Sequence, residues 1–284
     1  MNTNKIVIVT DSSASIPPKA LKGLDVSVIP LWLIWDGEGL QDSVDITSSE
    51  FYKRLKSSKT MPTTSQPTPA EFATFFKKQA ETADSIVAVL VSSKISGTYE
   101  SAVIAKDQLS DLDIQVIDSA NSSMGMGFGV LAAADAAACG KSVDEVVKNA
   151  EDMLAKNHFI FLVDTLEFLH RSGRIRGTKR WLGTLLQVKP MLHFEDGLIQ
   201  PLTSERTMGK AIKRMLNITE QRLAGRQMHK AAVVDIDCPD RGDQVAEMIQ
   251  QRFKPSQILL SDVSPVVGNV VGPGAFGVTF YAED

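Results

Sequence analysis

The chain has 284 residues, of which 43% are hydrophobic and 23% are charged, and its formal net charge is −4. This length exceeds that of a usual single hydrophobic core and therefore favours two domains. The mildly acidic balance argues against nucleic acid and against an anionic membrane surface as binding partners.

The first part of the chain alternates apolar runs of strand length with amphipathic segments. Strands are predicted at 5–10, 26–35, 85–91 and 114–117. Capping boxes, each with a glutamate three residues after the hydroxyl residue, predict helices that begin after Thr47, Thr68 and Ser142. Further helices are expected after the proline pair at 17–18, at 98–109 and at 125–140. This alternation indicates a three-layer, Rossmann-like domain with a parallel sheet.

Hydroxyl-rich segments follow three of these strands. They are Asp11-Ser12-Ser13, the segment 92–99 and the segment 118–123, and another hydroxyl-rich turn is expected at 62–67. In open α/β sheets, ligands bind outside the carboxyl ends of the strands. Ser96 and Gly97 are expected where the next helix begins and presents unpaired backbone N–H groups. The sequence therefore predicts a polar site that accepts an anion and contains no fixed charge.

The pattern changes near residue 158. After a strand at 159–163, Arg171, Arg174 and Arg176 surround Gly173, and 189–202 reads as a hairpin that turns at 195–197. Helices at 208–223 and 240–253 and strands at 231–236, 258–263 and 277–281 complete the chain. We therefore expect an N-terminal α/β domain at 1–158 and a C-terminal α/β domain at 159–284 with a mixed, largely antiparallel sheet.

Signatures of the common enzyme classes are absent from the sequence. It contains no G-x-x-x-x-G-K-[ST], H-E-x-x-H or G-x-S-x-G motif, and the G-x-G-x-G run at 125–129 is better explained by close helix packing than by dinucleotide binding. Ser96 as a nucleophile would need a base from elsewhere in the sequence. Asp11, Asp118 and Asp164 each follow a strand, where an aspartate more often caps a turn than binds a metal. We expect no metal and no cofactor.

The cysteines and the N-terminus bear on the compartment. Cys139 and Cys238 form neither a disulfide framework nor a metal-ligand pattern, which suits a reducing environment. The N-terminus leads directly into a strand, and no apolar run reaches the length of a membrane span. A cytoplasmic protein with no stable membrane insertion is expected.

An ordered set of short motifs spans nearly the whole chain: Asp11-Ser12-Ser13, Thr64-Ser65-Gln66-Pro67, Ser93-Lys94-Ile95-Ser96-Gly97-Thr98-Tyr99, Ser172-Gly173-Arg174-Ile175, Lys189-Pro190-Met191-Leu192 and Gly272-Pro273-Gly274. In this order the motifs resemble the DegV family. The resemblance implies a two-domain α/β protein that binds a long-chain fatty acid in an interior tunnel, with the carboxylate at the domain junction. It also implies the role of binding subunit of a fatty acid kinase, in which a separate subunit phosphorylates the carboxylate.

The resemblance assigns the carboxylate contacts to Thr64 and Ser96. The supporting head-group region that it suggests comprises Ser65, Ser93, Gly97 and Asn269. The chain departs from the family pattern at Val270, where members commonly have a histidine, and at Ser172, where they commonly have a glycine.

Function hypotheses of different classes follow from these observations. The first is a fatty acid carrier without catalysis of its own, in which Arg171, Arg174 and Arg176 form a surface that docks a partner and do not hold the carboxylate. The second is a phosphotransferase or hydrolase acting on a small acyl or phosphorylated substrate, which requires a base near Ser96. The third is a lipid-sensing regulator.

Overall fold

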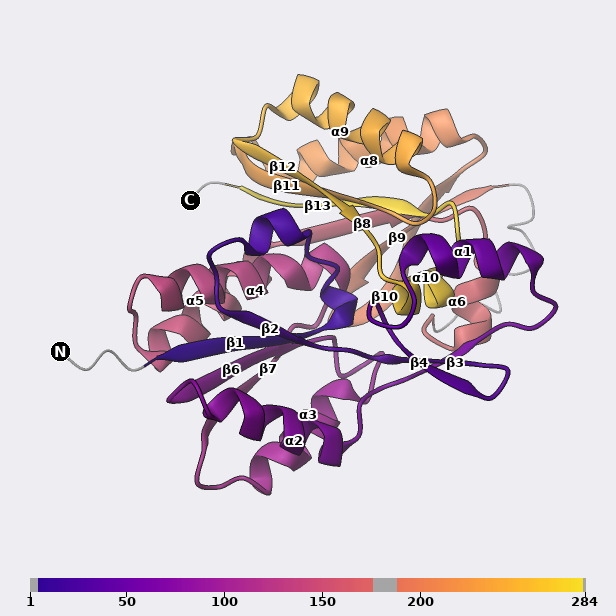
Figure 1. The fold of residues 1–284 in the computed structure, drawn as a ribbon. Coiled ribbons are helices and arrows are strands. Elements are labelled where there is room, and N and C mark those ends of the chain that lie inside the picture. The colour runs from indigo at the N-terminus through magenta and orange to yellow at the C-terminus, as the bar shows by residue number, and fades with distance from the viewer. Residues whose placement is uncertain (1–4, 176–187, 283–284) are drawn as a thin grey trace.

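In the computed structural model, which describes residues 5–175 and 188–282, helices cover two large β-sheets and a small sheet lies beside them (Figure 1). The four-stranded sheet has the order β2-β1-β6-β7, and the six-stranded sheet has the order β10-β9-β8-β13-β11-β12. The expected α/β class, with one parallel sheet and one mixed sheet, is confirmed. The domain boundary after residue 158 stays a prediction.

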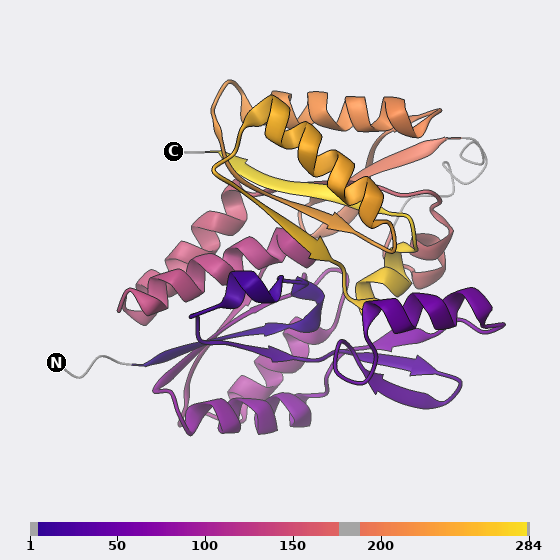
Figure 2. The ribbon, with the colours of Figure 1, turned by 45° about the horizontal axis from the view of Figure 1, so that its top comes forward.

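The four-stranded sheet is parallel throughout. Its strands are β1 (Ile6–Asp11), β2 (Val26–Ile29), β6 (Ser85–Leu90) and β7 (Asp113–Asp118). Helices α2 (Pro69–Ala80) and α3 (Thr98–Asp107) cover one face, and α4 (Ser123–Ala138) and α5 (Val143–Lys156) cover the other (Figure 2). Every residue of β1 and β6 is buried, as continuous apolar runs predict for strands with both faces covered.

The six-stranded sheet contains one parallel pair among its described strands, β11 with β12. Its strands are β8 (His158–Leu162), β9 (Lys189–Glu195), β10 (Leu198–Glu205), β11 (Met228–Asp235), β12 (Gln257–Asp262) and β13 (Phe276–Ala282). Helices α8 (Met208–Leu223) and α9 (Pro239–Phe253) cover its outer face. The inner face packs on α4, where Phe128 meets Tyr281 edge to face at 5.2 Å. Helix α4 thus lies between the two large sheets (Figure 1).

The small sheet corrects two expectations. Residues 26–35 were predicted as one strand but form β2 and β3 (Trp32–Trp35), because Pro30 between them lacks the N–H that a continuous strand must donate. β3 pairs with β4 (Glu38–Gln41) and with β5 (Thr63–Ser65). The hydroxyl-rich segment at 62–67, expected as a turn, therefore contains a strand that holds Thr64 opposite Leu33.

The capping boxes predict the helix starts correctly. Helices α1 (Ser48–Ser57), α2 and α5 begin after Thr47, Thr68 and Ser142, whose side chains each accept the backbone N–H of the glutamate three residues later. Within the described ranges, the remaining short helices are η1 (Ser12–Ala14), η2 (Pro18–Leu21), α6 (Glu167–Ser172) and α10 (Pro265–Val271). Helix α10 was not predicted, although Ser264-Pro265 carries a helix-start signal.

The glycine run at 125–129 lies inside α4 and allows close packing, as expected. A Cβ atom on Gly129 would lie 2.7 Å from the Leu154 side chain of α5, and one on Gly125 would overlap Asn121 Oδ1. Neither position has room for a carbon atom. These glycines let α5 and the loop before α4 approach the helix backbone.

Candidate functional site

A cavity lies between the two large sheets, at the carboxyl ends of β1, β6 and β7. The surrounding atoms leave about 770 Å³ empty, a volume that includes the part open to solvent. Its walls come from the six-stranded sheet, from the segments that follow β1 and β6, from β5, from the start of α4 and from α10. The position agrees with the rule that ligands bind beyond the carboxyl ends of parallel strands.

One end of the cavity is aromatic. Phe159 and Phe161 of β8 and Phe194 of β9 line it, and the rings of Phe159 and Phe194 stack at 5.9 Å with an interplanar angle of 9°. Four valines of α10 add to the apolar wall, namely Val266, Val267, Val270 and Val271. Val270 thus adds apolar surface to the cavity.

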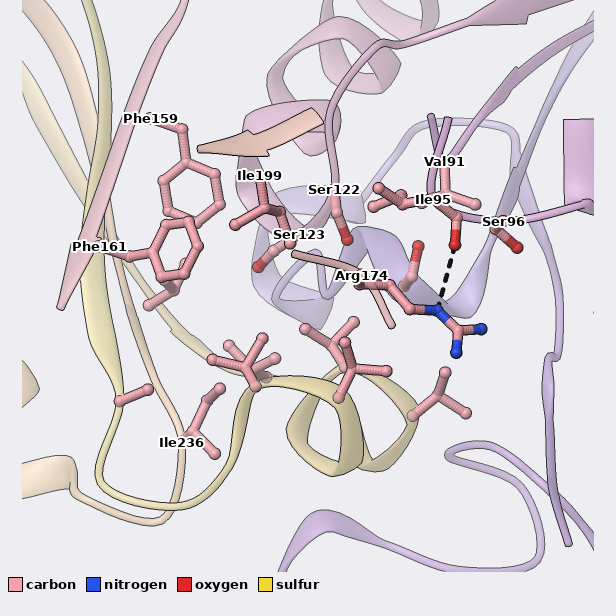
Figure 3. Close-up of a pocket in the computed structure, with 18 of the residues that line it drawn as sticks. Val91, Ile95, Ser96, Ser122, Ser123, Phe159, Phe161, Arg174, Ile199 and Ile236 are labelled. Carbon is pink, nitrogen blue, oxygen red and sulfur yellow. Dashed lines mark hydrogen bonds between the residues drawn. The ribbon is translucent and has the colours of Figure 1, made fainter. Parts of the chain in front are cut away.

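The other end carries hydroxyls and one cation. Thr64, Ser96 and Arg174 all line the cavity, and Figure 3 shows Ser96 and Arg174 on the side away from the phenylalanines. Ser96 Oγ lies 2.8 Å from Thr98 Oγ1 and accepts the Thr98 backbone N–H at 3.3 Å. If the buried Thr98 hydroxyl donates to Ser96 Oγ, the Ser96 proton is free to point at a ligand oxygen.

Arg174 is fixed by two backbone carbonyls. Its Nε donates to Ile95 O at 3.3 Å, drawn in Figure 3, and its Nη1 donates to Ser172 O at 2.6 Å. The expectation that the site contains no fixed charge is therefore wrong. Sequence spacing could not reveal this, because Arg174 and Ile95 are 79 positions apart and meet only in the folded chain.

The three arginines predicted as one surface do not share one environment. Arg174 is half-buried at the cavity, whereas Arg171 is exposed with its guanidinium carbon 4.9 Å from the centre of the Phe168 ring. Arg176 lies outside the described residues. A docking role for Arg171 stays a prediction.

The predicted supporting residues lie outside the cavity wall. Ser65 and Ser93 are exposed, and the side chain of Ser65 points to the opposite side of β5 from that of Thr64. Gly97 packs against Gln66, whose Nε2 would lie 2.8 Å from a Cβ atom. Asn269 is buried and donates from Nδ2 to Pro62 O at 3.0 Å, which ties α10 to the segment just before β5.

Two further serines, Ser122 and Ser123 at the start of α4, line the middle of the cavity (Figure 3). The sequence marks them as hydroxyls that follow a strand, but it does not separate them from their neighbours. Ser119 and Asn121 in the same loop are instead occupied by local hydrogen bonds. Only the fold shows which of these hydroxyls face the cavity.

A buried carboxylate network lies behind the cavity wall. Asp42 accepts the Ser12 hydroxyl at 2.6 Å and the Val266 backbone N–H, at the start of α10, at 3.1 Å. Burial raises the pKa of Asp42 to about 6, although both hydrogen bonds act to lower it. Burial also raises the pKa of Asp11, which accepts bonds from Ser13 and from the Val91 backbone N–H. The network joins β1, the small sheet and α10.

The strand-end aspartates considered for a metal have protein partners. Asp118 accepts the backbone N–H groups of Ser93 and Ala120, so it holds a turn. Asp164 pairs with Lys189 at 2.7 Å and with Arg241 at 3.1 Å. Within 5–175 and 188–282, no three metal-ligating side chains gather. In the same ranges, no helix is long and apolar enough to cross a membrane.

Comparison with known proteins agrees with this architecture. A family model described as "Uncharacterised protein, DegV family" matches residues 5–283. A DegV domain-containing protein of Listeria innocua is 33% identical over 277 residues, which cover 97% of this chain and 98% of the relative.

Two solved structures superpose over nearly the full length. One is described as fatty acid binding of a DegV family protein from Thermus thermophilus. It is 30% identical with a TM-score of 0.92, and the match covers 98% of this chain and 100% of that chain. The other, described as DegV, a fatty acid binding protein from Bacillus subtilis, is 30% identical with a TM-score of 0.90 and covers 99% of this chain and 100% of its own. The chain therefore belongs to the DegV family.

Proposed function

We propose that this protein binds a long-chain fatty acid in the cavity between its two sheets. The carboxylate lies at Thr64 and Ser96, and the alkyl chain extends toward the phenylalanine end. The observation that carries the proposal is the polarity of the cavity, which has hydroxyls and a guanidinium at one end and aromatic and branched apolar side chains at the other. The relatives described as fatty acid binding proteins support the same ligand class.

The energetics suit this ligand. At about 0.8 kcal/mol for each buried methylene, a tail of roughly 14 methylenes contributes on the order of 11 kcal/mol before ordering costs. A carboxylate removed from water must be hydrogen-bonded, and Thr64 and Ser96 can each donate one bond. The tail therefore supplies most of the affinity. The hydroxyls orient the ligand, with its carboxylate at the polar end of the cavity.

A carrier role explains the cavity better than a catalytic one. A nucleophilic Ser96 would need a neighbouring base, whereas the partner found for its hydroxyl is Thr98. The titratable side chain in the described cavity wall is Arg174, and a guanidinium stays protonated in proteins. We further propose that a separate kinase subunit phosphorylates the bound carboxylate, that Arg171 contributes to docking it, and that the protein works in the cytoplasm.

Native mass spectrometry of the gently purified protein is expected to show a mass increment equal to one long-chain fatty acid. The acid should stay bound during purification because burial of its tail makes dissociation slow. Organic extraction of the same sample should then release it. A spectrum of apoprotein alone, unchanged by added oleate or palmitate, would contradict fatty acid binding. Acyl phosphate formed from ATP by the pure protein would instead contradict the carrier role.

Arg174→Ala is expected to weaken binding of the fatty acid by about tenfold or more, because a cation held near a partly desolvated carboxylate contributes on the order of 1.5–3 kcal/mol. The methyl ester of the same acid carries no charge, so its affinity should hardly change. Arg171→Ala is the matched control, since Arg171 is exposed and should affect neither ligand. Titration calorimetry with both ligands measures these affinities. Equal losses of affinity for acid and ester in Arg174→Ala would show that Arg174 has a structural role only.

A further inference from the structure

The cavity contains a second polar position, separate from the end that carries Thr64 and Ser96. Ser123, the first residue of α4, lines the cavity and is only 2% exposed. Its Oγ is buried and has no hydrogen-bond partner in the described parts of the chain. Leaving a buried hydroxyl unpaired is unfavourable, so this side chain is suited to a group that a ligand brings.

The start of α4 adds further donors at the same place. The first backbone N–H groups of a helix have no partner within the helix, and the side chain of the N-cap residue Ser122 makes no capping hydrogen bond. This helix spans 16 residues, long enough to favour partial negative charge at its N-terminus. A ligand oxygen that reaches Ser123 would therefore meet a hydroxyl and uncapped amides together.

The loop that holds this position is rigidly built. Asn121 Oδ1 accepts the Ser122 backbone N–H at 3.1 Å, and Asn121 O accepts the backbone N–H of Ser92 at 2.9 Å. Asn157 Nδ2 donates to Gly125 O, in the first turn of the helix, at 2.7 Å. Ser123 is therefore presented by fixed neighbours on both sides.

Figure 3 places Ser123 between the phenylalanine end and the Ser96–Arg174 end, with its hydroxyl turned toward the phenylalanines. With the carboxylate at Thr64 and Ser96, an alkyl chain that runs toward Phe159 and Phe161 passes this hydroxyl. A plain methylene there leaves Ser123 unsatisfied. An oxygen atom on the chain at that point would accept a hydrogen bond from it.

We propose that the start of α4, with Ser123 at its centre, is a subsite for an uncharged oxygen on the acyl chain, so that the protein accepts hydroxy or oxo fatty acids as well as plain ones. The inference rests on the proposed fatty acid site, and it deepens that site by naming a class of chains. The oxygen is uncharged because the surrounding wall is apolar and offers it hydroxyl and amide groups.

A series of monohydroxy octadecanoic acids, with the hydroxyl moved along the chain, tests the subsite beside octadecanoic acid itself. Against wild-type protein, affinity should drop when the hydroxyl meets the apolar wall and should recover by about tenfold at one mid-chain position, where Ser123 pairs with it. In Ser123→Ala this peak should vanish. Octadecanoic acid should bind Ser123→Ala at least as tightly as wild type, because an unsatisfied hydroxyl has been removed.

Ser123→Gly is the second variant, because Ser123 has a φ of 50° and glycine adopts this backbone conformation without strain. It removes the same hydroxyl and should lose the same peak, so a folding defect in Ser123→Ala would not leave the question open. Competition measured by native mass spectrometry gives the affinity ratios directly.

The outcomes separate the subsite from the fatty acid site itself. If octadecanoic acid fails to bind wild-type protein, the proposed function is wrong. If it binds but no hydroxyl position is preferred, or if the preference survives in both variants, only the subsite inference is overturned. A loss of octadecanoic acid binding in both folded variants would overturn it too, since Ser123 would then hold the carboxylate.

Discussion

Thr64→Val combined with Ser96→Ala is expected to weaken binding of a long-chain fatty acid by roughly a hundredfold or more, while binding of its methyl ester hardly changes. Each variant removes one donor to a charged group, worth about 1.5–3 kcal/mol. The apolar wall that holds the tail stays intact. The ester measures that tail contribution alone, because it carries no charge whose burial depends on the two hydroxyls. Titration of both ligands against the folded double variant gives the two losses.

Thr63→Val provides the matched control for this pair. Thr63 precedes Thr64 in β5, but its side chain points to the opposite side of the strand and is exposed. It should affect neither ligand. If acid and ester affinities fall equally in the double variant while its melting temperature is unchanged, Thr64 and Ser96 are not the carboxylate site. The head group would then lie at Arg174 or at the start of α4.

Local sequence signals predict much of this fold because they act within a few residues. The capping boxes at Thr47, Thr68 and Ser142 each satisfy their helix ends without help from the rest of the chain. The apolar run of β6 needs only burial on both faces to become a central strand. Pro30 also acts locally, because its missing N–H divides 26–35 into two strands.

The site was harder to predict, because contacts between distant segments determine it. Thr64 and Ser96 were selected through the family resemblance, and the fold brings both to one cavity. Arg174 was grouped with its sequence neighbours as a surface residue, yet its guanidinium is held by Ile95 from the other half of the chain. Likewise, α10 contributes a wall of the cavity although the sequence analysis predicts no helix there. The spacing of residues along the chain does not reveal such long-range contacts.

Asp42→Asn is expected to remove a pH dependence of stability that the wild-type protein shows between about pH 4 and about pH 6. The pKa of Asp42 is about 6 in the folded chain and 3.8 in the reference state, so the folded protein holds the extra proton in this window. Stability from this group is therefore fully present below the reference value and is lost as pH rises toward 6. The loss amounts to on the order of 3 kcal/mol across the window.

Unfolding by urea at a series of pH values, for wild type and Asp42→Asn, measures this contribution as a difference. Asp11 also has a raised pKa from burial and is present in both proteins, and its charge helps to raise the pKa of Asp42, so the difference includes the interaction of the two carboxyl groups. Asp111→Asn, at an exposed position, controls for the loss of one charge. A difference that stays constant from pH 4 to 6 would show that Asp42 titrates as it does in the unfolded chain. The predicted slope would instead show that the folded chain holds the Asp42 proton more tightly than the unfolded chain does.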